Sequence, residues 1–173
     1  MQMNTIKEHK NDNILENLVL KEVTQFLTFQ LDEDIYGIDI LNIKEIVEYG
    51  CVTKVPMMPD FIAGVINLRG SVVPVVDLAI RFSQAPSMRT SRSSILILEL
   101  EYENQKMEIG ITVDVVNEVI DILDRDIELA PSFGTKIRTD FIAGLGKRNK
   151  KLLVLLNIEK ILCVAELSEV VHH

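Results

Sequence analysis

An internal duplication constrains the fold of this chain more than any other feature of its sequence. The tetrapeptide of residues 61–64 recurs word for word at residues 141–144. Three further matches occur in the same order along the chain: 26–31 with 95–100, 37–46 with 110–119, and 72–78 with 152–158. A single tetrapeptide match can arise by chance, but four ordered matches indicate a duplicated unit of roughly 75 residues. We therefore expect two copies of one structural unit, the second with longer loops.

The two copies differ directly after the shared tetrapeptide. The first copy continues with residues 65–70 (VINLRG), and the second continues with residues 145–150 (LGKRNK). Arg69 is the only cation between residues 61 and 78, and it lies at a predicted turn beside Gly70, which tolerates a positive φ. An arginine on a rigid hairpin beside an aliphatic patch is a common interface combination. An ordinary hairpin tip with a solvated arginine is the plainer alternative.

The residue patterns predict about five short strands in each copy. In the first copy the predicted strands are 25–31, 35–40, an extended segment within 47–55, 65–68 and 72–78. In the second copy they include 95–100, 108–113, 115–122 and 152–156. Closing each set into a small barrel removes exposed strand edges, and two barrels side by side bury more apolar surface than one. We therefore predict a mainly β fold of two five-stranded barrels packed side by side, with short helical turns.

Three local features refine this prediction. Residues 61–63 are predicted to form one helical turn that ends at Gly64. Pro74 cannot donate to a β-ladder, so its strand is predicted to lie at an edge or at a bulge. Asn157 is predicted to cap a C-terminal helix, because apolar residues recur at helical spacing from Ile158 onward.

The composition argues against nucleic acid and membrane as direct partners. The net charge is −8, and the basic clusters around Arg89–Arg92 and Lys147–Lys151 are interpreted as solvated turns. A phosphate-binding surface normally needs a larger basic patch. The longest uncharged stretches are about eight residues, whereas a membrane-spanning helix needs ~20. We therefore expect no nucleic acid partner and no direct membrane insertion.

The sequence also offers little catalytic or metal-binding chemistry. His9 is the only histidine outside the C-terminal tail, which removes the commonest general base and metal ligand. Cys51 and Cys163 are too few and too far apart for a disulfide framework or a zinc pattern, and are interpreted as free thiols in a reducing cytosol. Phosphate-binding glycine loops and a nucleophile elbow are absent from the sequence. We expect neither an enzyme nor a cofactor.

The motifs of both copies together are specific. Those of the first copy are Tyr36–Ile40, Ile43, Glu45-Ile46, Val55-Pro56, Pro59, Phe61-Ile62, Gly64–Gly70, Val73-Pro74, Asp77-Leu78 and Arg81-Phe82. Those of the second copy are Gly110-Ile111, Val113-Asp114, Val116, Glu118-Val119, Pro131, Ile142 and Gly144. In this combination the chain resembles the CheW family, the coupling proteins of bacterial chemotaxis, over roughly residues 24–163. The resemblance implies two SH3-like five-stranded barrels, which accounts for the duplication.

The resemblance also implies a function. CheW-family members are non-enzymatic adaptors that tie the cytoplasmic hairpin of methyl-accepting chemoreceptors to the regulatory domain of a chemotaxis histidine kinase. By motif, the receptor-binding residues fall on Ile43, Glu45, Gly64 and Arg69, with Val65, Asn67 and Leu68 as weaker neighbours. Ile43 would offer an apolar contact, Gly64 would allow a receptor helix to approach the backbone, and Glu45 and Arg69 would offer opposite charges. Alternatively, Ile43 and Val65 belong to the core and Glu45–Arg69 is a structural pair.

For the kinase, the resemblance implies contacts on the outer sheet of the first barrel. The candidate residues are Tyr49, Val52, Lys54 and Met57, of which Tyr49 and Met57 are expected to be exposed. Phe133 stands alone in a polar loop and is a candidate for a ring contact with the kinase or with another adaptor; burial under its own loop is the alternative. Such an adaptor is expected in the cytoplasm, recruited to membrane receptor arrays.

The predicted domain organisation follows from these matches. Residues 1–22 form an N-terminal arm, 23–163 a CheW-like domain, and 164–173 a tail whose last two histidines are interpreted as a tag remnant. Within the domain the first copy covers about 24–83 and the second about 93–163, and strands can be exchanged between the two barrels. Two other function classes stay open: a small-ligand-binding or hydrolytic barrel that works in the seam, and an oligomerisation module.

Overall fold

The computed structural model describes residues 22–86, 88–132 and 134–163. Phe133, the C-terminal tail and all but the last residue of the N-terminal arm therefore lie outside the described residues. The strands are β1 Val23–Leu31, β2 Asp34–Asp39, β3 Ile43–Glu48, β4 Ile62–Leu68, β5 Ser71–Val76, β6 Ser94–Tyr102, β7 Gln105–Val113, β8 Val115–Leu123, β9 Ile142–Arg148 and β10 Lys151–Leu156. The short helices are η1 Ile40–Asn42, α2 Leu78–Arg81, η2 Asp124–Asp126, η3 Thr139–Phe141 and α3 Ile158–Ile161.

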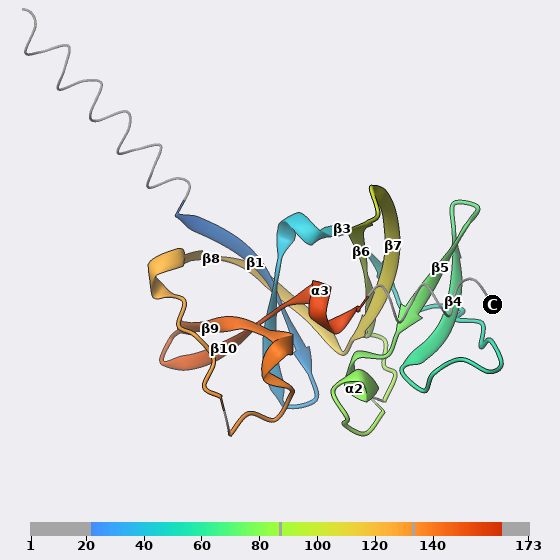
Figure 1. Cartoon of the computed structure of the whole chain (residues 1–173). Coiled ribbons are helices and arrows are strands. Elements are labelled where there is room, and N and C mark those ends of the chain that lie inside the picture. The colour runs from blue at the N-terminus through green and yellow to red at the C-terminus, as the bar shows by residue number, and fades with distance from the viewer. Residues whose placement is uncertain (1–21, 87, 133, 164–173) are drawn as a thin grey trace, which may run out of the picture.

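The strands form two five-stranded sheets, side by side in Figure 1, and each sheet takes strands from both copies. The strand order is β8-β1-β2-β10-β9 in the sheet that we call sheet I, and β3-β6-β7-β5-β4 in sheet II. Strands β1–β5 correspond to β6–β10 in the duplicated sequence, so the two orders are the same list with the copies interchanged. The predicted mainly β fold of two five-stranded units with short helical turns is confirmed.

The two copies pair twice within each sheet, along an antiparallel ladder (β1 with β8, β3 with β6) and at a short parallel junction. In sheet I, β2 pairs with β10 at Gly37 and Leu155, and in sheet II, β7 pairs with β5 at Gly110 and Val75. A Cβ atom on Gly37 would lie 3.0 Å from the Leu155 side chain, and one on Gly110 would lie 2.7 Å from Ile95. The glycine repeated in both copies is therefore explained by close packing at this junction.

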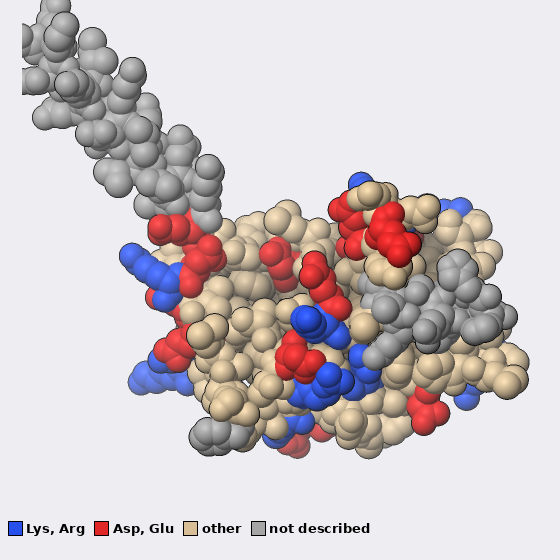
Figure 2. All heavy atoms as spheres, viewed as in Figure 1, with Lys and Arg blue, Asp and Glu red and all other residues tan. Residues whose placement is uncertain are grey.

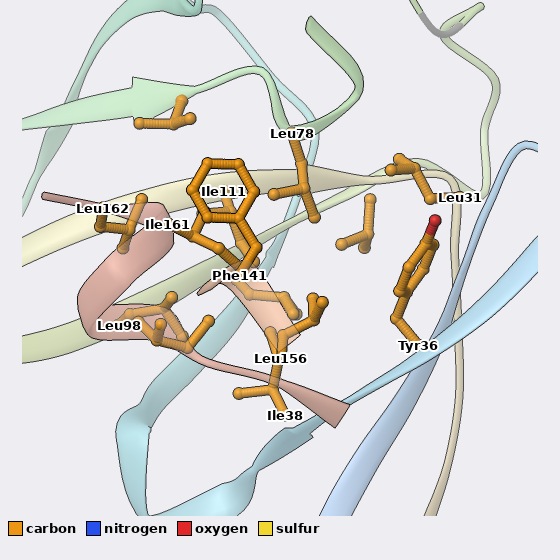
Figure 3. Packing of buried hydrophobic residues seen from close by; sticks show 14 of the residues in the cluster. Leu31, Tyr36, Ile38, Leu78, Leu98, Ile111, Phe141, Leu156, Ile161 and Leu162 are labelled. Atoms are coloured by element: carbon orange, nitrogen blue, oxygen red, sulfur yellow. The ribbon is translucent and has the colours of Figure 1, made fainter. Parts of the chain in front are cut away.

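Apolar residues form one large core between the sheets and a small core within each sheet. The large core takes Ile38 and Leu156 from sheet I and Leu98 and Ile111 from sheet II, and Phe141 lies among them (Figure 3). A smaller cluster is confined to sheet I and includes Phe26, Ile120, Ile122, Leu153 and Leu155. Its counterpart in sheet II includes Val73, Val75, Ile95 and Ile97. Each sheet therefore curls around its own apolar cluster while its outer face helps to form the shared core.

Equivalent side chains cap the two short α-helices. The Asp77 carboxylate accepts a hydrogen bond from the Ile80 N–H at 3.2 Å at the start of α2. The Asn157 side chain accepts one from the Lys160 N–H, also at 3.2 Å, at the start of α3. Such caps satisfy N–H groups that have no partner within the helix. The predicted capping role of Asn157 is confirmed.

One local prediction is wrong, and a second is correct only in part. Residues 61–63 do not form a helical turn, because β4 already begins at Ile62; the Ile62 N–H donates to the Pro59 carbonyl and closes a turn just before the strand. The strand of Pro74 is not an edge strand, because β5 lies between β4 and β7, but the β4–β5 ladder does shift register next to Pro74, opposite Val75 and Val76. Pairing with β7 involves only Val75 and Val76, so Pro74 precedes the part of the strand where a ladder N–H would be needed.

Candidate functional site

The turn between β4 and β5 holds Arg69 in a defined position. Arg69 has φ 52° and Gly70 has φ 84°, which is typical of the tight two-residue type I′ hairpin. The Asn67 side chain accepts a hydrogen bond from the Gly70 N–H at 3.0 Å and closes the turn. Asn67, predicted as a weaker receptor contact, therefore shapes the backbone that presents Arg69.

The Arg69 guanidinium pairs with Glu45 across the open side of sheet II. The distance between Arg69 Nη2 and Glu45 Oε2 is 2.8 Å. Glu45 lies on β3 and Arg69 follows β4, and these strands are the two edges of the sheet. The side chain of Arg69 is 72% exposed and that of Glu45 only 22%, and the second carboxylate oxygen of Glu45 is buried. The pair therefore connects the two edges and leaves mainly the arginine accessible to a partner.

A counterpart of this ion pair is present in sheet I. Glu118 occupies the position of Glu45 in the second copy, and its Oε1 lies 3.2 Å from Arg148 Nη2. Arg148 lies at the end of β9, next to Asn149, which occupies the position of Arg69. The sequence comparison missed this pair because the arginine is displaced by one residue between the copies. An edge-to-edge ion pair is thus common to both sheets.

A second ion pair in sheet II lies beside the first. The ammonium of Lys44 donates to the Glu108 carboxylate on β7 and lies 3.8 Å from Glu99 on β6. The pKa of Lys44 is raised, chiefly by the hydrogen bond to Glu108. Lys44 therefore stays protonated in the neutral range and fills the end of sheet II together with Glu108.

The remaining receptor candidates on β3 and β4 are partly committed to the fold. A register shift at Lys44 places Ile43 opposite Leu98, where it packs against the shared core. Val65 is half-buried, and its N–H donates to the Thr53 carbonyl at 2.9 Å. Leu68 is half-buried against the small core of sheet II. Both roles that the sequence left open for Ile43, core packing and surface contact, remain compatible with its half-buried position.

Gly64 has a structural reason to be glycine. It is buried with φ +151°, and a Cβ atom there would lie 2.2 Å from the Thr53 carbonyl oxygen and 2.8 Å from Val52. The segment that approaches its backbone closely is therefore the chain's own segment around Val52 and Thr53.

The structure brings three of the kinase candidates together. Tyr49, Lys54 and Met57 line a shallow pocket of about 530 Å³ beyond the C-terminal end of β3 in sheet II. Met57 is fully exposed with φ 64°, as expected. Tyr49 is only half-buried rather than fully exposed, because its ring packs against the small core of sheet II. Val52 lies beneath this surface, against Gly64.

Arg89 is a site residue that the sequence interpretation missed. Its guanidinium lies 4.2 Å from the centre of the Tyr49 ring, and its Nη2 lies 3.2 Å from the buried carboxylate of Asp77. The interpretation of the Arg89–Arg92 cluster as a solvated turn is therefore wrong for Arg89. A single arginine in a polar linker gives no periodic signal, so only the fold reveals its partners.

A larger pocket of about 640 Å³ lies between β6 of sheet II and the short helices η3 and α3. Its lining includes Asn42, Arg138, Glu159 and Lys160, and charged side chains of both signs gather around α3 on that face (Figure 2). Arg69 is not among its described lining residues. Leu41, which precedes Asn42 in η1, is 87% exposed. Asn42 at this pocket thus lies in the chain between the exposed Leu41 and the half-buried Ile43.

The described residues give little basis for metal chemistry or membrane insertion. Within residues 22–86, 88–132 and 134–163, histidine, cysteine and acidic side chains form no group of three or more that could hold a metal ion. No helix in that part of the chain is long and apolar enough to cross a membrane. Cys51 and Cys163 are free thiols.

Comparisons with known proteins agree with the geometry. Residues 25–166 match the family of the CheW-like domain. The chain is 38% identical to the chemotaxis protein CheW of Klebsiella aerogenes over 144 residues, which cover 83% of this chain and 84% of that protein. It is 33% identical to the chemotaxis protein CheW of Treponema pallidum over 150 residues, covering 86% of this chain and 87% of that protein.

A solved structure gives the same result. The crystal structure of the scaffolding protein TtCheW from Thermoanaerobacter tengcongensis matches with a TM-score of 0.72 and 37% identity, over 80% of this chain and 86% of that chain. The duplicated sequence, the two interleaved five-stranded sheets and these relatives lead to one conclusion: this chain belongs to the CheW family.

Proposed function

We propose that this chain, a non-enzymatic chemotaxis adaptor, connects the cytoplasmic hairpin of a methyl-accepting chemoreceptor to the regulatory domain of a histidine kinase. The observation that carries the receptor half of the proposal is the exposed Arg69 guanidinium on a tight turn. Its position is fixed by the type I′ backbone and by Glu45. An arginine held in this way loses little conformational freedom on binding, which favours recognition of an acidic or polar helix surface.

The exposures of the two charged side chains support different roles for them in this proposal. Arg69 contacts the receptor, and Glu45 positions the Arg69 side chain, because most of the Glu45 side chain is covered. Ile43 and the exposed Leu41 supply apolar contact area beside the charge. Gly64 acts through the fold of sheet II rather than through a contact of its own.

The kinase half of the proposal rests on the surface of Tyr49, Lys54 and Met57. The Arg89–Asp77 pair fixes the Tyr49 ring from the linker side, and Met57 adds a flexible apolar side chain. Methionine adapts well to irregular partner surfaces. With one surface for each partner, the adaptor raises the effective concentration of the kinase at the receptor. Receptor binding recruits the adaptor to membrane receptor arrays.

Separate loss of the two contacts tests this proposal. Binding of the chain to a receptor cytoplasmic fragment and to the kinase regulatory domain is measured by calorimetry for Arg69→Glu and Met57→Glu. We expect Arg69→Glu to lose receptor binding only, and Met57→Glu to lose kinase binding only. Arg148→Glu, at the counterpart ion pair of sheet I, is the matched control and keeps both affinities. Retained receptor binding by folded Arg69→Glu would overturn the receptor assignment.

A further inference from the structure

The end of sheet II near Lys44 and the equivalent end of sheet I are covered by different side chains. In sheet II, the Lys44–Glu108 and Glu45–Arg69 ion pairs cross the end of the sheet. Long charged side chains from three parts of the chain thus cover the small apolar core beneath them. Lys44 and Glu108 line none of five well-formed pockets in the described part of the chain.

In sheet I the second of these ion pairs is replaced by uncharged residues. The duplicated sequence places Asn117 at the position of Lys44 and Ile35 at the position of Glu108. Both line a hollow of about 480 Å³ whose floor includes Thr28, Ile120 and Leu153. The end of sheet I is therefore open down to its small apolar core.

Apolar surface continues from this hollow onto its rim. Ile35 on β2 is 40% exposed and Leu152 on β10 is 61% exposed, and both line the hollow. A small molecule in the hollow would leave part of these side chains in water. A protein segment laid across the end of the sheet covers both, as expected for a site that buries an apolar anchor within a polar rim.

The rim carries positive charge in an otherwise acidic chain. The hairpin of residues 147–151 contains four cations and no acid, whereas the whole chain has a net charge of −8. Lys147 pairs with Glu128 and Arg148 with Glu118. Lys150 and Lys151 form no ion pair with any residue that the structure describes. Lys151 lines the hollow, and Lys150 precedes it in the turn. Unpaired ammonium groups beside apolar surface favour a partner that carries carboxylates.

We propose that the open end of sheet I is a second docking surface, which binds an acidic amphipathic segment of a partner protein. An aliphatic side chain of that segment enters the hollow over Ile120 and Leu153. Carboxylates beside it pair with Lys150 and Lys151. This surface is distinct from the Arg69 turn and from the Tyr49 surface, which both belong to sheet II, so the adaptor has a third contact surface.

Designed peptides test the proposal on the intact chain. The probe is a helical peptide of roughly 15 residues with a leucine stripe flanked by glutamates, and two variants replace either the glutamates by lysines or the leucines by alanines. We expect only the glutamate–leucine peptide to bind, with amide chemical-shift changes at Ile35, Asn117 and Leu152. Leu152→Ser should weaken binding about tenfold, the order expected for loss of an anchor contact. Val72→Ser, the counterpart in sheet II, is the matched control and leaves the affinity unchanged.

Several results would overturn the proposal. Equal binding of the lysine peptide would remove the charge argument, and shift changes confined to sheet II would place the site elsewhere. Decanoate that fills the hollow while the peptide does not bind would identify a small-molecule site. Concentration-dependent self-association that Leu152→Ser abolishes, without peptide binding, would identify a second copy of this chain as the occupant.

Discussion

Replacing Gly64 by alanine tests whether this glycine serves the fold of sheet II. The new Cβ atom would lie 2.2 Å from the Thr53 carbonyl oxygen, so the segment around Thr53 must move. Overpacking of this kind costs about 1–3 kcal/mol, and a residue with a Cβ held at such a sparsely populated φ costs about 1–3 kcal/mol more. We therefore expect Gly64→Ala to lower the free energy of unfolding by roughly 2–6 kcal/mol.

Thermal unfolding provides the assay. At about 2–4 °C per kcal/mol for a domain of this size, the expected fall in Tm is roughly 4–24 °C. Gly70→Ala is the matched control, because Gly70 also has a positive φ, of 84°, but a Cβ there would meet nothing within 4 Å. Its cost should be about 1 kcal/mol. Equal Tm values for the two variants, or a Gly64→Ala variant as stable as the wild type, would refute the steric argument.

Three further substitutions follow from the contacts. Asp77→Ala removes the α2 cap and leaves Arg89 without its carboxylate. Urea unfolding should show that the free energy of unfolding falls by about 2 kcal/mol, against about 1 kcal/mol for Asn157→Ala, a control that removes only a cap. Equal losses in the two variants would contradict a role for the ion pair. Burial raises the pKa of the Tyr36 phenol above its ordinary value of 10.0. The stability that depends on the neutral phenol is therefore complete below about pH 10 and is lost as the pH rises further. Tyr36→Phe should make the urea unfolding midpoint fall less steeply with pH in this range, and an unchanged slope would contradict the role of Tyr36. Arg69→Ala should change stability by less than about 1 kcal/mol in urea unfolding, because the pair is largely exposed on the arginine side, and a larger loss would mean that the pair is needed for the fold.

The sequence was sufficient to predict the repeated unit, the hairpin that carries Arg69 and the Asn157 cap, because these depend on local chemistry. The sequence could not predict which strands of one copy pair with which strands of the other. Both copies carry the same alternation and the same junction glycine, so Gly37 and Gly110 fit either partner equally well until the sheets are assembled. The pattern of each strand is satisfied in both arrangements, and only tertiary packing decides between them.

The candidate site was predictable to the extent that it depends on one turn. Arg69 stood out as a lone cation beside a glycine, and the structure confirms that a tight turn presents it. Contacts between residues far apart in the sequence gave no comparable pattern in the sequence. Arg89 meets Tyr49 and Asp77 only after the linker folds back, and the close approach to Gly64 comes from a segment with no regular pattern of its own.

The central claim is that this adaptor couples receptor to kinase through the Arg69 turn. The most direct test measures autophosphorylation of the cognate histidine kinase with receptor present, as the chain is added. We predict a receptor-dependent change in rate that requires the chain and is lost with Arg69→Glu but kept with Arg148→Glu. A rate that is indifferent to the folded wild-type chain, or that responds equally to Arg69→Glu, would contradict the account.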